Sequence, residues 1–478
     1  MLFNSYQFIF VFLPVALAGY FASNRLGNLA PVIWLALASL AFYSVSNWQF
    51  VLLLLASIAF NYVIGLLLIT RRLPAAPRFA VLTAGVAGDL AVLGYFKYAG
   101  FLAANLNAIF STGFAVDVLL PVGISFYTFT QIAFLVDAFR GNVARYALPH
   151  YALFVTYFPH LIAGPILHHK DMIPQFERAE AKRPDPHLIL CGLIIFAIGL
   201  FKKTCLADGI QPLVAPAFGA NSPTFDQAWI GALAYTFQLY FDFSGYSDMA
   251  IGISLMFGIF LPLNFNSPYK ASSIIDFWRR WHMTLSRFLR DYLYIPLGGN
   301  RHGPVLRYVN LMITMVLGGL WHGAAWTFVA WGALHGAYLC VNHAWNRFGP
   351  AIAPRFEPAA DIVAIILTFS SVVVAWVFFR ADSMSSATYV LSRMADPTQI
   401  TFGRTEMAHV LLIIAYAAIA WFAPNTQAIM GYDHTNRTVG QRLGAWRTRP
   451  AFLYMTAAAL AFGILGIQRH SEFIYFRF

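Results

Sequence analysis

Long apolar stretches recur along the whole chain, and they restrict its fold more than any other feature. A helix that crosses a membrane needs about 20 mainly apolar residues. The candidates are residues 7–23, 29–46, 50–69, 79–96, 118–136, 188–201, 228–257, 308–341, 360–379, 407–423 and 452–468. A further stretch, 150–164, is shorter and contains Pro159, Gly164 and Pro165, so we expect it to be re-entrant. The sequence therefore predicts an all-α polytopic membrane protein with about 11–12 membrane segments.

The composition agrees with a chain that lipid solvates. Of the 478 residues, 59% are hydrophobic and 11% are charged, whereas soluble domains carry roughly 25% charged residues. The formal net charge is +11, which in a soluble protein would suggest a nucleic-acid partner. Here the basic residues lie in short loops between apolar runs, where they orient the chain and contact anionic lipids. We therefore expect membrane lipids and no nucleic acid as partners.

Basic residues in the loops also predict the orientation of the chain, because cytoplasmic loops carry an excess of Lys and Arg. Arg25 follows the first apolar stretch, and the loop 70–78 after the third contains three arginines. We therefore expect the N-terminus to lie outside and the polar stretches 168–187 and 258–307 to be cytoplasmic. No soluble domain or repeat interrupts the chain, so we expect one membrane-embedded domain over residues 1–478.

The stretch 308–341 is expected to enter the membrane and return on the same side. If it crossed once, the four arginines of residues 437–449 would lie outside, against the charge rule. Its 34 residues would reach only about 51 Å as a helix, which is too short for two crossings of a core about 30 Å thick. A hairpin that turns at Gly318–Gly323 satisfies both constraints and places His322 about 21 Å deep.

His322 is the strongest candidate for chemistry. An ionisable side chain inside an apolar segment is costly, and by default it suggests function. The alternative is a structural histidine that bonds a neighbouring carbonyl. Two glycines precede His322, one follows it, and Trp321 is its neighbour; small residues allow a backbone or a ligand to approach closely. We interpret His322 as the catalytic residue, with Trp321 supporting the site.

A second histidine, His282, lies in an arginine-rich segment. Apolar residues with helical spacing predict an amphipathic helix at the cytoplasmic surface; they are Phe277, Trp281, Leu285 and Phe288. One interpretation is an interfacial helix without a catalytic role. The other is that Trp278, Arg279 and Arg280 contact a phosphorylated donor while His282 faces the reaction path, because the planar fork of arginine suits phosphate.

Other polar residues in apolar segments are expected to have supporting or packing roles. The segment 240–248 is unusually polar, and Asp242 and Asp248 would face a watery cavity or cap broken helices. We expect them to support the site. His335 comes 13 residues after His322; on one helix the two would point to different faces, so His335 is expected to pack against another helix.

The sequence contains no signature of a metal or nucleotide site. The three cysteines, Cys191, Cys205 and Cys340, are far apart and have no metal or redox spacing. There is no H-E-x-x-H motif, Walker A motif or G-x-G-x-x-G motif after a strand. We expect no metal and no tightly bound cofactor.

Several motifs, taken in order, resemble the membrane-bound O-acyltransferase family, and most closely its bacterial branch of alginate O-acetylation membrane subunits. The matching segments are Leu120–Tyr127, Ile162–Ile166, Tyr240–Asp248, Asn264–Tyr269, Phe277–Ser286, Tyr292–Asn300, Leu320–Gly323 and Phe473–Phe476. The resemblance implies a ring of tilted helices around a central funnel. It also implies a catalytic histidine near the middle of the membrane at His322, and a second functional histidine at His282.

The same resemblance implies an activity. It is the transfer of an acyl group, expected to be acetyl, from a cytoplasmic donor such as acetyl-CoA towards an exported polysaccharide. The branch acts in the bacterial inner membrane, through an extracytoplasmic partner protein or directly. A neutral imidazole, with an ordinary pKa of about 6.5, can act as the base towards a hydroxyl. The acceptor stays open among alginate, cellulose, another exopolysaccharide and a teichoic-type polymer.

Two other classes of protein fit parts of the sequence. Transporters also use broken helices and polar residues inside the membrane. A scaffold that recruits a periplasmic polysaccharide acetyltransferase would need no chemistry of its own. The lack of repeat symmetry and the arginine-rich segment favour an O-acyltransferase over a transporter.

Overall fold

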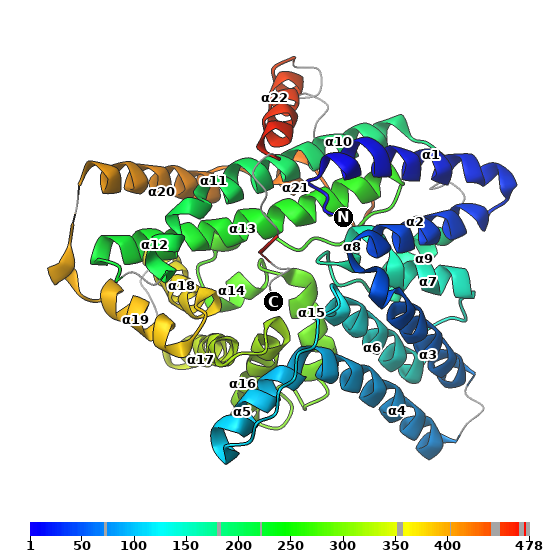
Figure 1. The fold of residues 1–478 in the computed structure, drawn as a ribbon, viewed down its shortest axis with the longest axis horizontal. Coiled ribbons are helices and arrows are strands. Elements are labelled where there is room, and N and C mark those ends of the chain that lie inside the picture. Colours follow the sequence, from blue (N-terminus) through cyan, green and yellow to red (C-terminus); the bar gives the residue numbers. More distant parts are fainter. Residues whose placement is uncertain are drawn as a thin grey trace. The chain divides into compact units, whose positions relative to one another are not determined.

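The structure, a computed structural model, describes residues 1–70, 74–178, 183–219, 222–350, 357–401, 403–440, 450–467 and 473–474. Helices make up most of these ranges (Figure 1), and the β-structure within them is a single isolated bridge between Asp433 and Thr438. The expected all-α class is confirmed. The following residues used in the sequence analysis lie outside the described ranges: Arg71, Arg72, Arg442, Arg447, Arg449, Tyr475 and Phe476.

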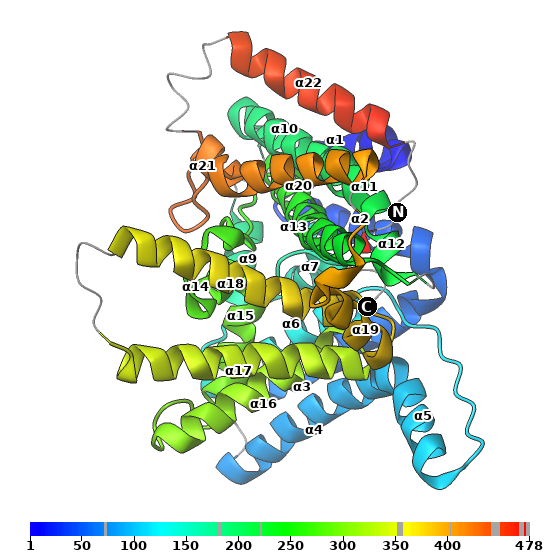
Figure 2. The same cartoon turned by 90° about the vertical axis from the view of Figure 1, so that its left-hand side faces the viewer.

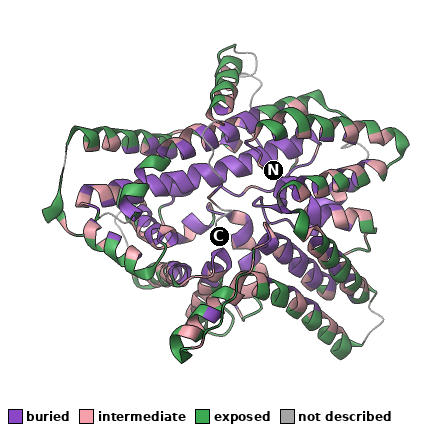
Figure 3. Ribbon diagram, viewed as in Figure 1, coloured by how far each residue is buried: buried purple, intermediate pink, exposed green. Residues whose placement is uncertain are grey.

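The chain divides into two compact units. The first contains Met1–Leu200, Tyr246–Pro262 and Met430–Gln468, and the second contains Phe201–Gly245, Leu263–Ile429 and Arg469–Phe478. The long helix α13 (Phe225–Met256) belongs to the second unit up to Gly245 and to the first beyond it. Nearly all of α13 is buried (Figure 3). One membrane-embedded domain over the whole chain stays a prediction.

The first unit consists of helices from three parts of the chain. Its further helices are α1 (Leu13–Ser23), α2 (Ala30–Asn47), α3 (Val51–Ile69), α4 (Ala75–Leu93), α5 (Ala99–Phe110), α6 (Ile124–Arg140), α7 (Leu148–Thr156), α8 (Phe158–Leu161), α9 (His169–Glu177), α10 (Pro186–Phe201, of which Phe201 opens the second unit) and α22 (Pro450–Gly466). The stretch 150–164 forms the short helices α7 and α8, which are separated at Tyr157. Its path in the membrane stays a prediction.

The second unit carries both candidate histidines. Its further helices are α11 (Asp208–Ile210), α12 (Ala215–Phe218), α14 (Ile274–Trp278), α15 (Met283–Leu289), α16 (Pro304–His322), α17 (Trp326–Phe348), α18 (Glu357–Arg380), α19 (Met384–Met394), α20 (Arg404–Phe422) and α21 (Thr426–Met430, whose last residue belongs to the first unit). A π-helix, η6 (Lys202–Ala207), precedes α11, and another, η9 (Arg290–Tyr294), follows α15.

Seven helices in the described residues are long and apolar enough to cross a membrane. They are Phe8–Leu26, Trp48–Ile69, Ala75–Phe110, Pro186–Leu213, Pro304–His322, Pro358–Arg380 and Arg404–Phe422. Two shorter apolar helices, Ala30–Val45 and Pro450–Gly466, add to them. A polytopic membrane protein is the fold class that such helices require. The total of 11–12 segments and the ring around a funnel stay predictions.

The helices α16 and α17 form a hairpin with a short turn at residues 323–325 (Figures 1 and 2). Their backbones approach closely through glycine. A Cβ atom on Gly319 would collide with the carbonyl of Phe328, and one on Gly332 would collide with that of Met315. The absence of a side chain at these two positions therefore allows the two helices to pack side by side.

This hairpin differs from the expected one. Gly318 and Gly319 lie inside α16 and allow close packing, so they do not form the turn. The two helices contain 19 and 23 residues, or about 28 and 34 Å at about 1.5 Å per residue. They extend beyond residues 308–341, and their lengths are close to the thickness of a membrane core, about 30 Å. The depth of the turn in the membrane stays a prediction.

Candidate active site

His322 is the last residue of α16, and aromatic rings surround it. The side chain is buried, with 4% of the residue exposed. Its ring centroid lies 5.0 Å from that of Trp321, 5.0 Å from that of Trp331 on α17 and 5.2 Å from that of Phe379 on α18. The imidazole therefore packs against aromatic rings from the three helices α16, α17 and α18.

His282 lies at the junction between α14 and α15, and it is fully buried. Phe243 on α13 packs edge-on against its ring, with centroids 4.9 Å apart. In the sequence, His282 lies between two candidate membrane spans, Pro186–Leu213 and Pro304–His322, and in neither of them. Burial lowers the pKa of His282 to about 3, because removal from water disfavours the charged imidazolium. The ring is therefore neutral at physiological pH.

The fold brings the two histidines together from separate parts of the sequence. The ring centroids of His282 and His322 lie 6.3 Å apart, with their planes at 58°. Trp321 packs against both, at 6.0 Å from His282 and 5.0 Å from His322. Two imidazoles at this separation can contact one small reacting group between them, which makes the pair a candidate for proton transfer.

Asn264 anchors His282 and the residues after it. The Asn264 Oδ1 atom lies 3.2 Å from His282 Nδ1, and it accepts from the hydroxyl of Thr284 over 2.7 Å. The Asn264 carbonyl accepts from the N–H of Met283 over 3.0 Å. One asparagine therefore bonds three consecutive residues at the start of α15.

The segment around His282 is not the continuous amphipathic helix that the spacing predicts. His282 has φ 41° and ψ 54°, which is a left-handed conformation that ends α14 and begins α15 anew. The predicted apolar positions are nevertheless all buried: Phe277, Trp281, Leu285 and Phe288. They pack inside the unit, so the predicted surface helix is wrong. The interruption between α14 and α15 lies where Asn264, 18 residues before His282 in the sequence, bonds residues 282–284.

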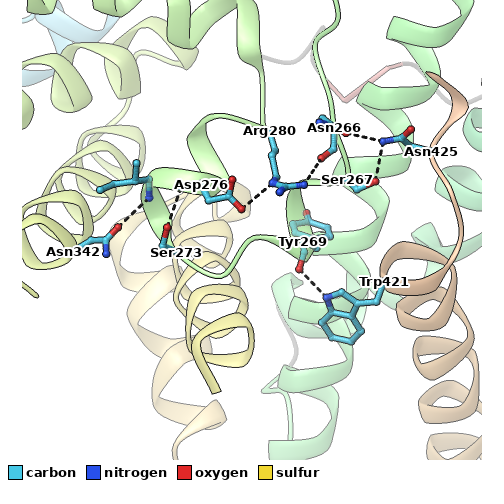
Figure 4. Close-up of polar contacts among 10 residues, drawn as sticks. Asn266, Ser267, Tyr269, Ser273, Asp276, Arg280, Asn342, Trp421 and Asn425 are labelled. Atoms are coloured by element: carbon cyan, nitrogen blue, oxygen red, sulfur yellow. Dashed lines mark hydrogen bonds and ion pairs between the residues drawn. The ribbon is translucent and has the colours of Figure 1, made fainter. Parts of the chain in front are cut away.

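Contacts with neighbouring helices fix the rest of this segment (Figure 4). The side-chain oxygen of Asn342 on α17 accepts from the N–H of Ile275 over 3.2 Å. The indole of Trp421 on α20 donates to the carbonyl of Tyr269 over 2.8 Å. The chain that carries His282 is therefore tied to two long helices of the second unit.

The three residues expected to contact the donor lie in different surroundings. Arg280 donates to Asp276 over 2.9 Å (Figure 4), and Arg279 is exposed. Trp278 is buried, and its ring centroid lies 5.2 Å from that of His335. Arg279 is thus the residue of the three that presents a charge at the surface. Donor binding by these residues stays a prediction.

Asp242 belongs to a buried cluster of charges. Lys203 Nζ lies 2.6 Å from Asp242 Oδ1 and 2.9 Å from Asp208 Oδ1. The N–H of Ile474 donates to Asp242 Oδ2 over 3.0 Å, and Lys203 Nζ lies 4.8 Å from the ring centroid of Phe473. A buried carboxylate with such partners is compensated. The cluster joins η6, α13 and the C-terminal residues 473–474.

The two expected supporting carboxylates therefore lie in separate surroundings. Asp242 is in the second unit with the histidines, but its hydrogen bonds go to Lys203 and Ile474. Asp248 is buried in the first unit. Support of the site by either carboxylate stays a prediction.

His335 packs in an aromatic environment. Its ring centroid lies 4.8 Å from that of Trp331 and 5.9 Å from that of Phe277. Neither ring nitrogen has a hydrogen-bond partner among the described residues. The helix ends at His322, so the angle argument that separated it from His335 was wrong, and both histidines contact Trp331.

The membrane-bound O-acyltransferase family model matches residues 20–386 of the chain. The chain belongs to this family. The match includes both histidines and all helices that contact them. Membership makes the protein an acyltransferase and a multi-pass membrane protein, and it confirms the family that the motifs indicated.

Several named proteins are similar to this chain. A peptidoglycan O-acetyltransferase from Helicobacter pylori is 45% identical, over 82% of this chain and 80% of its own length. A probable alginate O-acetylase AlgI from Azotobacter vinelandii is 41% identical over the whole of both chains. A teichoic acid D-alanyltransferase from Streptococcus thermophilus is 26% identical, over 54% of this chain and 68% of its own.

Sequence reasoning missed three of the residues that contact the two histidines. They are Asn264, Phe243 and Phe379. Asn264 has a signal in the sequence, because it is the one polar residue between Phe257 and Phe265. In the part of the chain that the structure describes, no group of three or more His, Cys, Asp or Glu is placed to hold a metal ion. The absence of a metal stays a prediction.

Proposed function

We propose that the protein moves an acetyl group from acetyl-CoA in the cytoplasm to an exported polysaccharide, through an extracytoplasmic partner protein. The proposed location is the bacterial inner membrane, with the N-terminus outside. Relatives that are named for O-acetylation of peptidoglycan and of alginate support acetyl as the acyl group and a polysaccharide as the acceptor class. The two names differ in the polymer, so the proposal covers the class.

The proximity of His282 and His322 carries the proposal. Their ring centroids are 6.3 Å apart in a buried aromatic environment. In the proposed reaction, His322 accepts the proton of the attacking hydroxyl while its oxygen bonds the thioester carbon. The carbon–sulfur bond then breaks, and the leaving thiolate takes that proton from His322, which returns the imidazole to its neutral form. General-base help of this kind contributes about 10²–10⁴-fold to a rate.

The charge pattern supports the direction of transfer. Arg279, Arg287 and Arg290 lie in the stretch 258–307, which the arginine excess assigns to the cytoplasm. Bidentate arginine contacts would suit the phosphates of a coenzyme A donor. In this proposal the donor reaches the histidines from the arginine-rich side, and the acceptor or partner protein from the opposite side.

The experiment is a comparison of cell-surface polymers. A strain without the gene is complemented with the wild-type chain or with His322→Ala, and polymer-bound acetate is measured by mass spectrometry. We expect loss of acetate in the deletion strain, rescue by the wild type and no rescue by His322→Ala at equal membrane expression. Unchanged acetate in the deletion strain would contradict the proposed function.

A further inference from the structure

Asn264 holds His282 through its side chain and through its backbone. Its Oδ1 atom lies 3.2 Å from His282 Nδ1 and 2.7 Å from Thr284 Oγ1, and its carbonyl accepts from Met283. Asn264 and His282 are both buried. The shared oxygen of Asn264 holds both side chains in place, because loss of either bond would leave a buried polar group unsatisfied and lower the free energy of unfolding.

The surrounding donors determine which side-chain atom of Asn264 faces His282. The backbone N–H of Thr284 points to the same atom over 3.4 Å, and an N–H group can only donate. This atom is therefore the amide oxygen. An oxygen that can only accept requires a proton on His282 Nδ1. In a neutral imidazole the other nitrogen, Nε2, then has the lone pair.

The backbone of His282 agrees with a fixed position. A non-glycine residue at φ 41° is in an unfavourable conformation that persists where surrounding contacts impose it. The bonds from Asn264 to residues 282–284 supply those contacts, together with the bond from Asn266 N–H to the Arg280 carbonyl over 2.9 Å. Such conformations cluster at functional sites.

We propose that Asn264 is a positioning residue, which keeps the proton on His282 Nδ1 and leaves the lone pair of Nε2 to share the proton that His322 takes from the hydroxyl during acyl transfer. This inference rests on the proposed function. An amide orients the ring without adding charge, whereas a carboxylate at the same place would favour the imidazolium. Among the ring contacts of His282 with described residues, the titratable partner is His322 on α16, and Phe243 on α13 and Trp321 are uncharged.

The decisive variant is Asn264→Asp, which keeps the shape and the accepting oxygen but adds a negative charge. The pH dependence of acetyl-CoA turnover is measured in purified full-length protein that is supplied with its partner protein and with alginate as the acetyl acceptor. We expect the acid limb of the profile to move to higher pH by at least about one unit, because one unit corresponds to a tenfold change in the protonation equilibrium. The KM for acetyl-CoA should stay unchanged, and kcat should recover at high pH.

The matched control is Asn266→Asp, the same chemical change two residues away. The Asn266 side chain is exposed and bonds Asn425 and Gln427, so the wild-type pH profile is expected. A second pair covers the case in which Asn264→Asp fails to fold. Asn264→Ala should lower kcat about 10–100-fold, the range for residues that orient a reacting ligand. Thr284→Val, which removes the hydroxyl donor to the same oxygen and keeps the backbone N–H, should change kcat less than about threefold.

The outcomes separate this inference from the proposed function. No turnover in the wild-type protein would overturn both. Normal turnover in the wild type with an unmoved profile in Asn264→Asp would overturn the positioning role alone. A loss in Thr284→Val as large as that in Asn264→Ala would also overturn it, because the shared oxygen would then serve the local fold and not the imidazole.

Discussion

The second unit contains two buried polar clusters, Lys203 with Asp208 and Asp242, and His282 with His322. In the first, opposite charges lie 2.6 and 2.9 Å apart. In the second, neutral aromatic side chains surround two imidazoles whose centroids lie 6.3 Å apart, and an amide orients one of them. Both clusters contain ionisable groups in an apolar interior, where such groups are expensive.

The difference separates a structural role from a chemical one. The charges of the lysine cluster compensate each other, so removal of one partner leaves another unpaired in the interior. The histidines can be neutral without a counter-charge, and a neutral imidazole can accept a proton and return it. We therefore expect changes in the first cluster to lower stability, and changes in the second to lower activity.

The largest expected effect on stability comes from Lys203→Met, which leaves Asp208 and Asp242 buried without their cation. The free energy of unfolding should fall by about 3–5 kcal/mol, measured as a lower unfolding temperature in detergent. The control is Lys202→Met, since Lys202 is partly exposed and donates to Thr426; we expect about 1 kcal/mol there. Equal unfolding temperatures for Lys203→Met and Lys202→Met would contradict a structural role of the charged cluster.

The next effect concerns activity, in His282→Ala. Acetyl-CoA turnover should fall about 100-fold, the lower end of the range for general acid–base groups. The fall in unfolding temperature should be smaller than that of Lys203→Met, because no charge is left unpaired. Turnover is measured in purified protein at matched concentrations of folded enzyme. A variant with wild-type turnover and lower stability would place His282 with the structural cluster.

The smallest effect is expected for His335→Phe. His335 is buried among Trp278, Trp331 and Phe277, as a phenyl ring could be. A swap of similar volume should change the free energy of unfolding by less than about 1.5 kcal/mol and leave turnover near the wild-type value. This variant sharpens the comparison, because it tests whether burial among aromatic rings alone makes a histidine essential. A loss like that of His282→Ala would extend the site to His335.

The sequence was sufficient for the class of fold, and it singled out two histidines that the structure places together. Apolar stretches of membrane-spanning length mark most of the long helices, because lipid demands that length. His322 stands out as an ionisable residue in such a stretch, and the motifs around His282 indicated the family. These signals are local, so they can be read along the chain.

The geometry of the site depends on contacts between distant residues. The apolar spacing of residues 277–288 predicts one continuous helix. In the structure the helix is interrupted at His282, where the Asn264 side chain bonds both His282 and Thr284. Asp242 was expected to support the site, and the structure pairs it with Lys203, which lies 39 residues away in the sequence. The spacing of residues along the sequence does not predict these pairings. The pairings determine which polar side chains contact each other in the fold.

The most direct measurement of the central claim uses purified protein and labelled acetyl-CoA, with His322→Ala beside the wild type. His322 and its neighbour His282 are the proposed site of proton transfer. We expect release of coenzyme A and transfer of the labelled acetyl group to the added partner protein and polysaccharide to fall about 10²–10⁴-fold in the variant. The unfolding temperature should stay close to that of the wild type. Near-wild-type transfer by folded His322→Ala would contradict the account.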